Sequence, residues 1–276
     1  MNSDAVADYP KPAEWDFSRW TDWLATVFFG GMGIFVLLQV PGSMSSHQWI
    51  RVAFFVSLGL GTLAMGVLPW AYSRKSLSGA RLSIDGRGVL IDETAILGRL
   101  TMVSTSCLSF GAVVFIVWMP SGSLGLPLTG GQRVFFPIVA GVIAVYGLIE
   151  LARAVAQAPI GRLVMTPEEV SFKQTSKGRI TLAWSDISEI ALPTGKALKW
   201  HSVSVKCDHA GPGRGASLDA RWPSIGCAAT YWLVRFYQRH PELREELADR
   251  RVIDRIESGG LLDPDDPKAR MALRSM

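Results

Sequence analysis

Four long apolar segments constrain this chain more than any other feature. They run from about Trp23 to Val40, Val52 to Tyr72, Leu100 to Met119 and Val134 to Leu151. The first three contain no Asp, Glu, Lys or Arg. A helix needs about 20 apolar residues to cross the hydrocarbon core of a bilayer. The pattern therefore predicts four membrane-spanning helices, of which the fourth is long enough only if Glu150 lies at the interface.

The first apolar segment is expected to stay in the protein as a helix. The stretch ahead of it, 1–22, carries five acidic residues against two basic ones, whereas a cleaved signal peptide begins with a positively charged region. Residues 1–21 are interpreted as a polar segment that is disordered or lies on the surface. Charged residues make up only 19% of the 276 residues, below the roughly 25% of soluble proteins, because the apolar segments lack them.

The distribution of Lys and Arg predicts the orientation in the membrane. The links that follow the first and third segments carry almost none, whereas residues 73–99 carry five and the region beyond Pro159 carries 18. Positively charged residues stay on the cytoplasmic side of a membrane. Both termini and the middle link are therefore expected in the cytoplasm, in a multi-pass protein of the plasma (inner) membrane.

The chain contains an internal repeat. Residues 79–91 align with residues 160–172, and the spans ahead of them fall into the same register. Each copy predicts a short strand, a tight turn and a second strand. We interpret this as a degenerate duplication of two spans plus a hairpin. The first hairpin, 80–92, is expected to run into the third span within a four-span region at 22–155, rather than to complete a domain.

Residues 159–240 show the period-two pattern of strands and end in one amphipathic helix. Short strands are expected at 162–166, 170–174, 180–184, 187–192, 198–207 and 216–220. The apolar stripe of the closing helix includes Trp232. Residues 241–276 predict a charged helix at 242–257 and then a disordered tail, because the stretch 263–267 is rich in Asp and Pro.

Three stretches of this region carry a resemblance to a known family: Leu163–Val170, Trp184–Ile190 and Tyr237–Leu247. They resemble the bacterial pleckstrin-homology-like (PH-like) domain of multi-span membrane proteins, especially those of actinobacteria. The resemblance implies a bent β-sandwich or barrel capped by a C-terminal helix, with a binding or scaffolding role rather than a reaction. The expected fold class is a four-helix transmembrane bundle followed by a small cytoplasmic PH-like β-domain.

Basic residues gather around one predicted hairpin of this domain. Lys173, Lys177 and Arg179 follow the spacing Lys-x3-Lys-x-Arg, and a similar pattern near the first hairpin of eukaryotic PH domains binds phosphoinositide headgroups. A cation near anionic lipid gains about 1 kcal/mol. These three are the candidate lipid- or partner-binding residues. The plainer interpretation is a solvated face with the ordinary excess of positive charge on the cytoplasmic side.

Three other residues are expected to be structural markers of the domain rather than ligand-binding residues. Trp184 and the closing helix, with its Trp232, would seal the open sandwich. Asp186 precedes an apolar strand and would accept backbone hydrogen bonds at the turn.

No residue set predicts an enzyme, a cofactor or a metal centre. The sequence lacks P-loop, Rossmann, kinase-type and nucleophile-elbow patterns, and nothing in it resembles a nucleic-acid reader. Cys207 and His209, with His201 and Cys227 as further candidates, lack the spacing of a zinc site. No metal site is therefore predicted.

Two functional hypotheses remain from different classes. The leading one is a non-enzymatic plasma-membrane protein whose domain binds an unknown protein partner or the anionic lipid surface. The alternative is a small transporter or channel accessory subunit that works through its transmembrane bundle. Glu150 is its acidic candidate, although Arg153, three residues later on the same helix face, is expected to pair with it. The oligomeric state stays open, with a homo-oligomer among the alternatives.

Overall fold

The computed structural model of the chain divides into two compact units. It describes residues 9–10, 12, 19–73, 81–93, 95–126, 128–156, 162–174, 178–191, 202–207, 216–220 and 222–274. The helical unit comprises Ser18–Arg74 and Ala95–Ala158, and the β unit comprises Met1–Phe17, Lys75–Thr94 and Pro159–Met276. The β unit is thus assembled from three separate stretches of the chain. Residues 80–92 belong to it, so their assignment to the four-span region is wrong.

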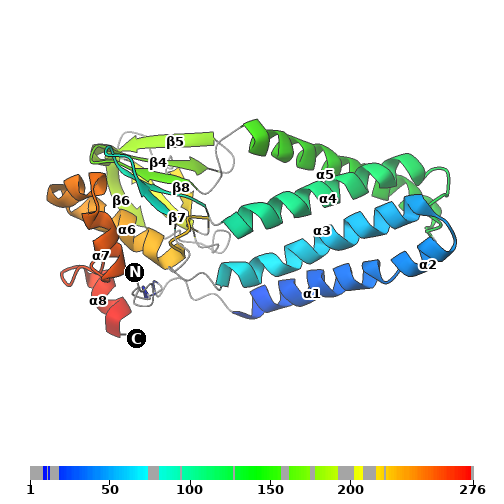
Figure 1. Cartoon of the computed structure of the whole chain (residues 1–276), viewed down its shortest axis with the longest axis horizontal. Coiled ribbons are helices and arrows are strands. Elements are labelled where there is room, and N and C mark those ends of the chain that lie inside the picture. The colour runs from blue at the N-terminus through cyan, green and yellow to red at the C-terminus, as the bar shows by residue number, and fades with distance from the viewer. Residues whose placement is uncertain are drawn as a thin grey trace. The chain divides into compact units, whose positions relative to one another are not determined.

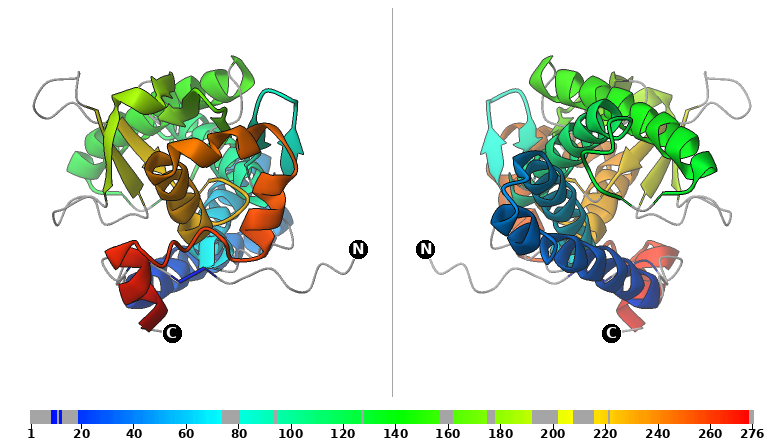
Figure 2. Two further views of the ribbon diagram at one scale, coloured as in Figure 1. Left: turned by 90° about the vertical axis from the view of Figure 1, so that its left-hand side faces the viewer. Right: turned by 90° about the vertical axis from the view of Figure 1, so that its right-hand side faces the viewer.

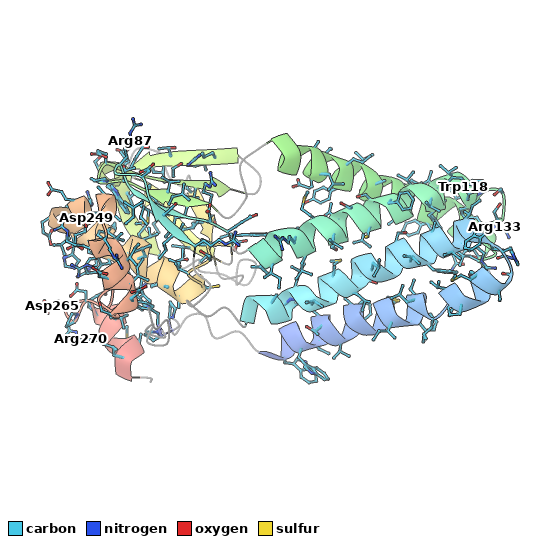
Figure 3. All side chains as sticks on the ribbon, in the orientation of Figure 1. Arg87, Trp118, Arg133, Asp249, Asp265 and Arg270 are labelled. Carbon is cyan, nitrogen blue, oxygen red and sulfur yellow. The ribbon has the colours of Figure 1, made fainter. Side chains whose placement is uncertain are left out.

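The helical unit contains the four apolar segments as helices. Its elements are α1 (Arg19–Leu37), α2 (Val40–Ser45), α3 (Trp49–Ser73), α4 (Ala95–Trp118) and α5 (Gly130–Ala156). Four helical stretches are long and apolar enough to cross a membrane: Trp23–Ser45, Trp49–Pro69, Ile96–Trp118 and Gly130–Arg153. The prediction of four helices long and apolar enough to span a membrane is confirmed, with ends a few residues away from the predicted ones. Figure 3 shows Trp118 and Arg133 at the same end of α4 and α5.

The long helices pack in sequence order rather than as a closed bundle. Extensive contacts join α1 to α3, α3 to α4 and α4 to α5, and Figure 1 shows the helices following one another in this order. Within the described residues, no comparable contact joins α1 to α5. These two end helices leave many large apolar side chains exposed. The expected four-helix bundle is therefore an open row, seen end-on in the right-hand view of Figure 2.

Small residues allow neighbouring helices of the row to approach closely. A Cβ added at Gly33 of α1 would lie 2.9 Å from the carbonyl oxygen of Gly59 in α3. A Cβ added at Gly61 of α3 would lie 2.8 Å from the Leu108 side chain of α4. The Ser104 hydroxyl of α4 donates to the Gly61 carbonyl oxygen over 3.0 Å. Close backbone approach and interhelical hydrogen bonds are what hold helices together in lipid.

Gly33→Leu is expected to push α1 away from α3, because the new side chain would meet the backbone of Gly59 and Leu63 as well as the Leu63 side chain, and the backbone cannot move aside. Overpacking of this kind costs about 1–3 kcal/mol. Gly31→Leu is the matched control, since nothing lies within 4 Å of a Cβ added there. Thermal unfolding of the two variants in detergent measures the difference. Equal melting temperatures would contradict the close α1–α3 contact.

The β unit contains a five-stranded antiparallel sheet. Its strands, in spatial order, are β1 (Leu82–Ile84), β2 (Val89–Ile91), β3 (Leu163–Met165), β4 (Glu169–Gln174) and β5 (Gly178–Ala183). Every second residue of a strand points to the same face of a sheet. Two apolar rows cross the inner face, Leu82–Ile91–Leu163–Phe172–Ile180 and Ile84–Val89–Met165–Val170–Leu182. Both rows pack into the core of the unit.

The internal repeat is visible in this sheet, because β1 and β2 correspond to β3 and β4. The two hairpin turns also use the same contacts. In the first turn the Asp85 carboxylate accepts from the backbone N–H groups two and three residues later, both over 3.0 Å. In the second turn the Thr166 hydroxyl accepts from the equivalent N–H groups over 3.3 and 3.1 Å. Side chains that satisfy backbone donors in this way stabilise turns.

The two hairpins lie side by side, which corrects the expectation for the first one. β2 pairs with β3 in register, with Val89 opposite Met165 and Ile91 opposite Leu163. The first hairpin therefore supplies two of the five strands instead of running into the third span without completing a domain. An isolated two-stranded hairpin is marginally stable at best. Pairing with β3 gives it the covered apolar face that it lacks alone.

A second sheet and a helix complete the β unit. The sheet contains β6 (Ile187–Ala191), β7 (Ser202–Cys207) and β8 (Ala216–Asp219), and a short turn of 3-10 helix, η3 (Trp184–Asp186), joins β5 to β6. The helix α6 (Cys227–Arg239) contacts β6 and buries eight of its residues, Trp232 among them. A small antiparallel β region closed by one helix is thus present. It contains two strands more than the region beyond residue 159 supplies.

The C-terminal region forms several helices. The charged stretch at 242–257 is helical as expected, although it forms two helices instead of one, and the expected disordered tail is wrong for residues 267–274. Its elements are η5 (Pro241–Ala248), a 3-10 helix, followed by α7 (Arg251–Glu257) and α8 (Pro267–Arg274). The Asp266 carboxylate accepts from the N–H of Lys268 over 3.0 Å, and Pro267 is the first residue of α8. Asp before a helix and Pro at its first position are both favourable. The Asp- and Pro-rich stretch therefore starts a helix. The left-hand view of Figure 2 shows these helices in orange and red.

Part of the N-terminal segment also belongs to the core. The described residues Tyr9, Pro10 and Pro12 are all buried, and Tyr9 is 5% exposed. For these residues the expected disordered or surface-lying segment is wrong. Residues 1–21 are polar on average, so their composition does not indicate that Tyr9 and Pro10 are core residues. The partners of these two residues lie in α6 and α7, near the other end of the chain.

Ile91→Ala is expected to destabilise the β unit by about 2–5 kcal/mol, because the side chain is fully buried between two strands of the inner face. Leu90→Ala is the matched control, since Leu90 is half-buried on the other face of the same strand. Limited proteolysis of the full chain measures cleavage beyond Pro159. Equal protection of that region in the two variants would argue against the shared sheet.

Candidate functional site

The predicted basic residues lie on the β4–β5 hairpin. Lys173 and Arg179 are backbone partners in the ladder, whereas Lys177 and the side chain of Lys173 lie outside the described residues. Arg179 is exposed, and its Nε donates to the Ser171 hydroxyl over 2.8 Å. The Thr181 hydroxyl also donates to this oxygen, over 3.1 Å. Two of the three predicted residues thus come together, and the Arg179 side chain is fixed on the outer face of the sheet.

Three chain connections leave the end of the sheet at which this hairpin lies. Arg81 precedes β1, Asp92 follows β2 and Arg162 precedes β3. Each is the neighbour in sequence of a residue in the inner row that runs from Leu82 to Ile180. From each of them the chain leads into a helix of the helical unit. The Arg162 guanidinium and the Asp92 carboxylate form an ion pair over 3.1 Å. The opposite end of the sheet carries the two hairpin turns, including Arg87 (Figure 3).

The three structural markers have different environments. Trp184 and Trp232 are core residues, each 2% exposed. The indole N–H of Trp184 donates to the Thr166 carbonyl over 2.8 Å and so joins η3 to the β3–β4 turn. The carboxylate of Asp186 accepts from the Ser185 hydroxyl over 3.3 Å, not from the backbone N–H groups that the sequence suggests. Asp186 is half-buried and marks the η3 turn without capping it.

A charged groove beside α6 has no counterpart among the sequence predictions. It has a volume of about 590 Å³ and is lined by residues of β6, α6, η5 and α8, including Glu189, Arg239, His240 and Lys268. β6 is an edge strand, and uncovered edges invite pairing with other chains. Two side chains of α6 cover this edge. The amide of Gln238 donates to the Ser188 carbonyl over 3.4 Å, and Arg235 Nη1 donates to the Ile190 carbonyl over 3.1 Å.

The most buried charges of the groove attach α8 to α6. Arg235 donates to Asp266 through both Nε and Nη2, the latter over 3.0 Å, and the two side chains are 11% and 3% exposed. Burial opposes ionisation of Asp266. Hydrogen bonds from Arg235 and from the Lys268 backbone nevertheless hold the pKa of Asp266 below its ordinary value. A paired and hydrogen-bonded charge of this kind fixes the geometry of the two helices.

A second set of contacts ties the groove to the α7–α8 link. His240 Nδ1 lies 3.0 Å from Glu242 Oε1, and its Nε2 lies 3.1 Å from Asp263 Oδ2. Only a doubly protonated imidazole donates to both carboxylates. Arg239 faces Asp263 and Asp266 at 3.7 and 3.9 Å, which are ion-pair distances without a hydrogen bond. Arg235, Arg239 and His240 each lie against carboxylates of the same chain. The groove is therefore a set of ion pairs that connects helices, rather than a preformed anion site.

The chain gives no sign of a metal centre in the parts that the structure describes. Of the residues weighed as zinc ligands, Cys227 has a described side chain, whereas His201, His209 and the side chain of Cys207 lie outside the described residues. No family model, curated protein or solved structure matches this chain. Functional inference therefore starts from the geometry of the two units.

Arg235, Asp266 and Tyr9 do not stand out in the sequence as site residues. Asp266 followed by Pro267 is a helix-start signal that is present in the sequence. Arg235 and Tyr9 have no local signal, because their partners are 31 residues or more away along the chain. A buried arginine within an apolar helix stripe is the one indirect clue, since such a charge needs a carboxylate partner.

Asp266→Ala is expected to detach α8 from α6, because it leaves the Arg235 guanidinium buried without its carboxylate and removes the cap of α8. Breaking a buried ion pair from one side costs about 3–5 kcal/mol. Hydrogen–deuterium exchange of residues 267–274 measures the detachment. Asp265→Ala is the matched control, because Asp265 is exposed. Unchanged exchange in Asp266→Ala would show that the pair does not hold the helix.

Proposed function

We propose that this chain is a non-enzymatic integral protein of the plasma (inner) membrane that holds a PH-like binding domain against the anionic lipid surface. Both termini are placed in the cytoplasm in this proposal. The observation that carries it is the pairing of β2 with β3. Because these strands lie on either side of α4 and α5 in the sequence, the β unit cannot be separated from the spans. A domain built in this way is suited to work at the membrane.

The architecture of the β unit supports the PH-like assignment in part. Two antiparallel sheets and one closing helix are the elements that the resemblance implies. The larger sheet departs from a self-contained domain, because β1 and β2 come from the link between the second and third spans. The domain proposed to bind is therefore the whole β unit and not residues 159–240 alone.

The position of the basic hairpin supports lipid as the ligand. Lys173 and Arg179 share their end of the sheet with the three links to the spans. Only three residues, 92–94, separate the end of β2 from the start of α4, and an extended residue spans at most about 3.6 Å. We propose that this short link keeps cations at this end of the sheet close to lipid headgroups, where each would gain about 1 kcal/mol.

The transporter alternative receives no specific support from the geometry. Its acidic candidate, Glu150, forms an ion pair with Arg153 over 2.7 Å on α5, as the sequence predicts. A carboxylate at the end of a span that pairs with its own helix is the plainer arrangement. We therefore propose one function, binding at the membrane surface.

Arg179→Gln is expected to weaken docking of the hairpin on anionic lipid about fivefold, the equivalent of about 1 kcal/mol. The full chain is placed in nanodiscs of phosphatidylcholine alone or of an equimolar mixture with anionic phosphatidylglycerol, and hydrogen exchange of residues 169–183 is compared. Anionic lipid should protect the hairpin of the native chain. Arg179→Gln should lose most of this protection, whereas Arg179→Lys keeps the charge and should retain it.

Arg87→Gln is the matched control, because Arg87 is also exposed but lies at the opposite end of the same sheet. It should leave the effect of anionic lipid unchanged. If anionic lipid gives no protection to the hairpin of the native chain, lipid is not its ligand. A protein partner would then be the remaining form of the binding hypothesis.

A further inference from the structure

The N-terminal Tyr9 and Pro10 are held in the β unit as a peptide is held in a binding site. The indole N–H of Trp232 in α6 donates to the carbonyl oxygen of Pro10 over 2.8 Å. The Tyr9 hydroxyl donates to the carbonyl oxygen of Ile256 over 2.8 Å, and the Arg255 carbonyl lies 3.3 Å away. The first two of these bonds are buried. A short N-terminal segment is therefore bound by α6 and α7, two helices from the C-terminal part of the chain.

The Tyr9 side chain binds the C-terminal end of α7. Arg255 and Ile256 lie in the last turn of this helix, where carbonyl groups lack helical donors. The Arg255 carbonyl accepts from the Gly260 N–H over 2.9 Å, so the main contribution of the Tyr9 hydroxyl is its bond to the Ile256 carbonyl. A phenol placed there supplies a donor and an apolar ring together. Burial raises the pKa of Tyr9, so the hydroxyl keeps its proton. The side chain is thus both an apolar anchor and a helix cap.

Prolines make this segment suited to burial. Pro10 and Pro12 are both buried, and proline has no backbone N–H that would need a partner. Its fixed φ also lowers the entropy lost when the segment binds. Proline-containing peptides are commonly bound by aromatic-lined grooves. The indole donor of Trp232, aimed at a proline carbonyl, has this chemistry.

We propose that Trp232 and the last turn of α7 form a binding site for a tyrosine–proline peptide segment. Tyr9, Pro10 and Pro12 occupy this site in cis, and a partner protein's segment of the same chemistry occupies it by displacing them. The site is separate from the basic hairpin, so the proposal stands whether or not that hairpin binds lipid. Without a segment in the site, the buried indole N–H loses its acceptor, and such losses are costly. The site therefore requires an occupant of this kind.

The covalent link explains how occupancy is controlled. Six residues, 13–18, join Pro12 to the start of α1. A tethered ligand acts at an effective concentration in the millimolar range for short linkers. A free peptide must therefore bind the site weakly while the tethered N-terminal segment is attached. It should bind well once that segment has been removed. Displacement of the segment would also release the chain ahead of α1.

The test uses the full chain with a site for a sequence-specific protease inserted among residues 13–18. After cleavage in detergent and dialysis, a labelled synthetic peptide of residues 5–14 is added and binding is followed by fluorescence anisotropy. The cut protein is expected to bind the peptide at least tenfold more tightly than the uncut protein. A Tyr9→Phe peptide, which lacks the hydroxyl, should bind about fivefold more weakly.

A matched pair of protein variants places the peptide. Trp232→Phe keeps an aromatic ring but removes the N–H, and it should weaken binding about fivefold. Trp222→Phe is the control, because the Trp222 N–H donates to Asp219 and not to the segment. If Trp232→Phe does not fold, the Tyr9→Phe peptide still tests the contact on unaltered protein.

Two results would overturn the proposal. One is a cut segment that stays bound through dialysis, since the site would then not exchange its occupant. The other is equal binding of the native and Tyr9→Phe peptides to the cut protein, since the helix-capping contact would then not recognise the ligand.

Discussion

The pairing of β2 with β3 is the constraint on which the rest of the structure depends. These strands lie before α4 and after α5 in the sequence, and neighbouring strands of a sheet lie about 4.8 Å apart. The ladder therefore fixes both ends of the segment that contains α4 and α5. It also completes the inner apolar rows, because β1 and β2 supply Leu82, Ile84, Val89 and Ile91 to the core. Among the described residues, the helices of the open row have a separate and smaller apolar cluster, which includes Phe54, Phe55 and Phe115.

The parts of the fold that follow from local pattern were predictable from the sequence. Long apolar runs with few or no charged residues give the four candidate spans, and period-two alternation gives the strands of the β unit. The internal repeat even identified the two hairpins that lie side by side. It did not reveal that they pair, because alternation shows which face of a strand is apolar but not which strand lies beside it. The prediction of a disordered tail at 261–276 is wrong for residues 267–274, because Asp266 and Pro267 start a helix there.

The candidate sites divide in the same way. The basic hairpin could be recognised because Lys173, Lys177 and Arg179 are close together in the sequence, although the structure describes the backbone of Lys173 and Arg179 and the side chain of Arg179 alone. The ion pair of Arg235 with Asp266 and the binding of Tyr9 could not be recognised from the sequence. Each depends on contacts between segments that are distant along the chain. Composition describes residues 1–21 as polar. The three residues that matter are apolar and become recognisable only once α6 and α7 are in place.

The shared sheet has a consequence for the order of events during synthesis. β1 and β2 are made before α4 and α5, and β3 is made after them. At about 5–20 residues per second, the roughly 70 residues between β2 and β3 take about 4 to 14 seconds. During that time the edge of β2 has no partner, and α4 and α5 must enter the bilayer before one arrives. Unpaired apolar edges are where chains aggregate. The interval between the two hairpins is therefore the period in which a nascent chain most needs either rapid insertion or a chaperone.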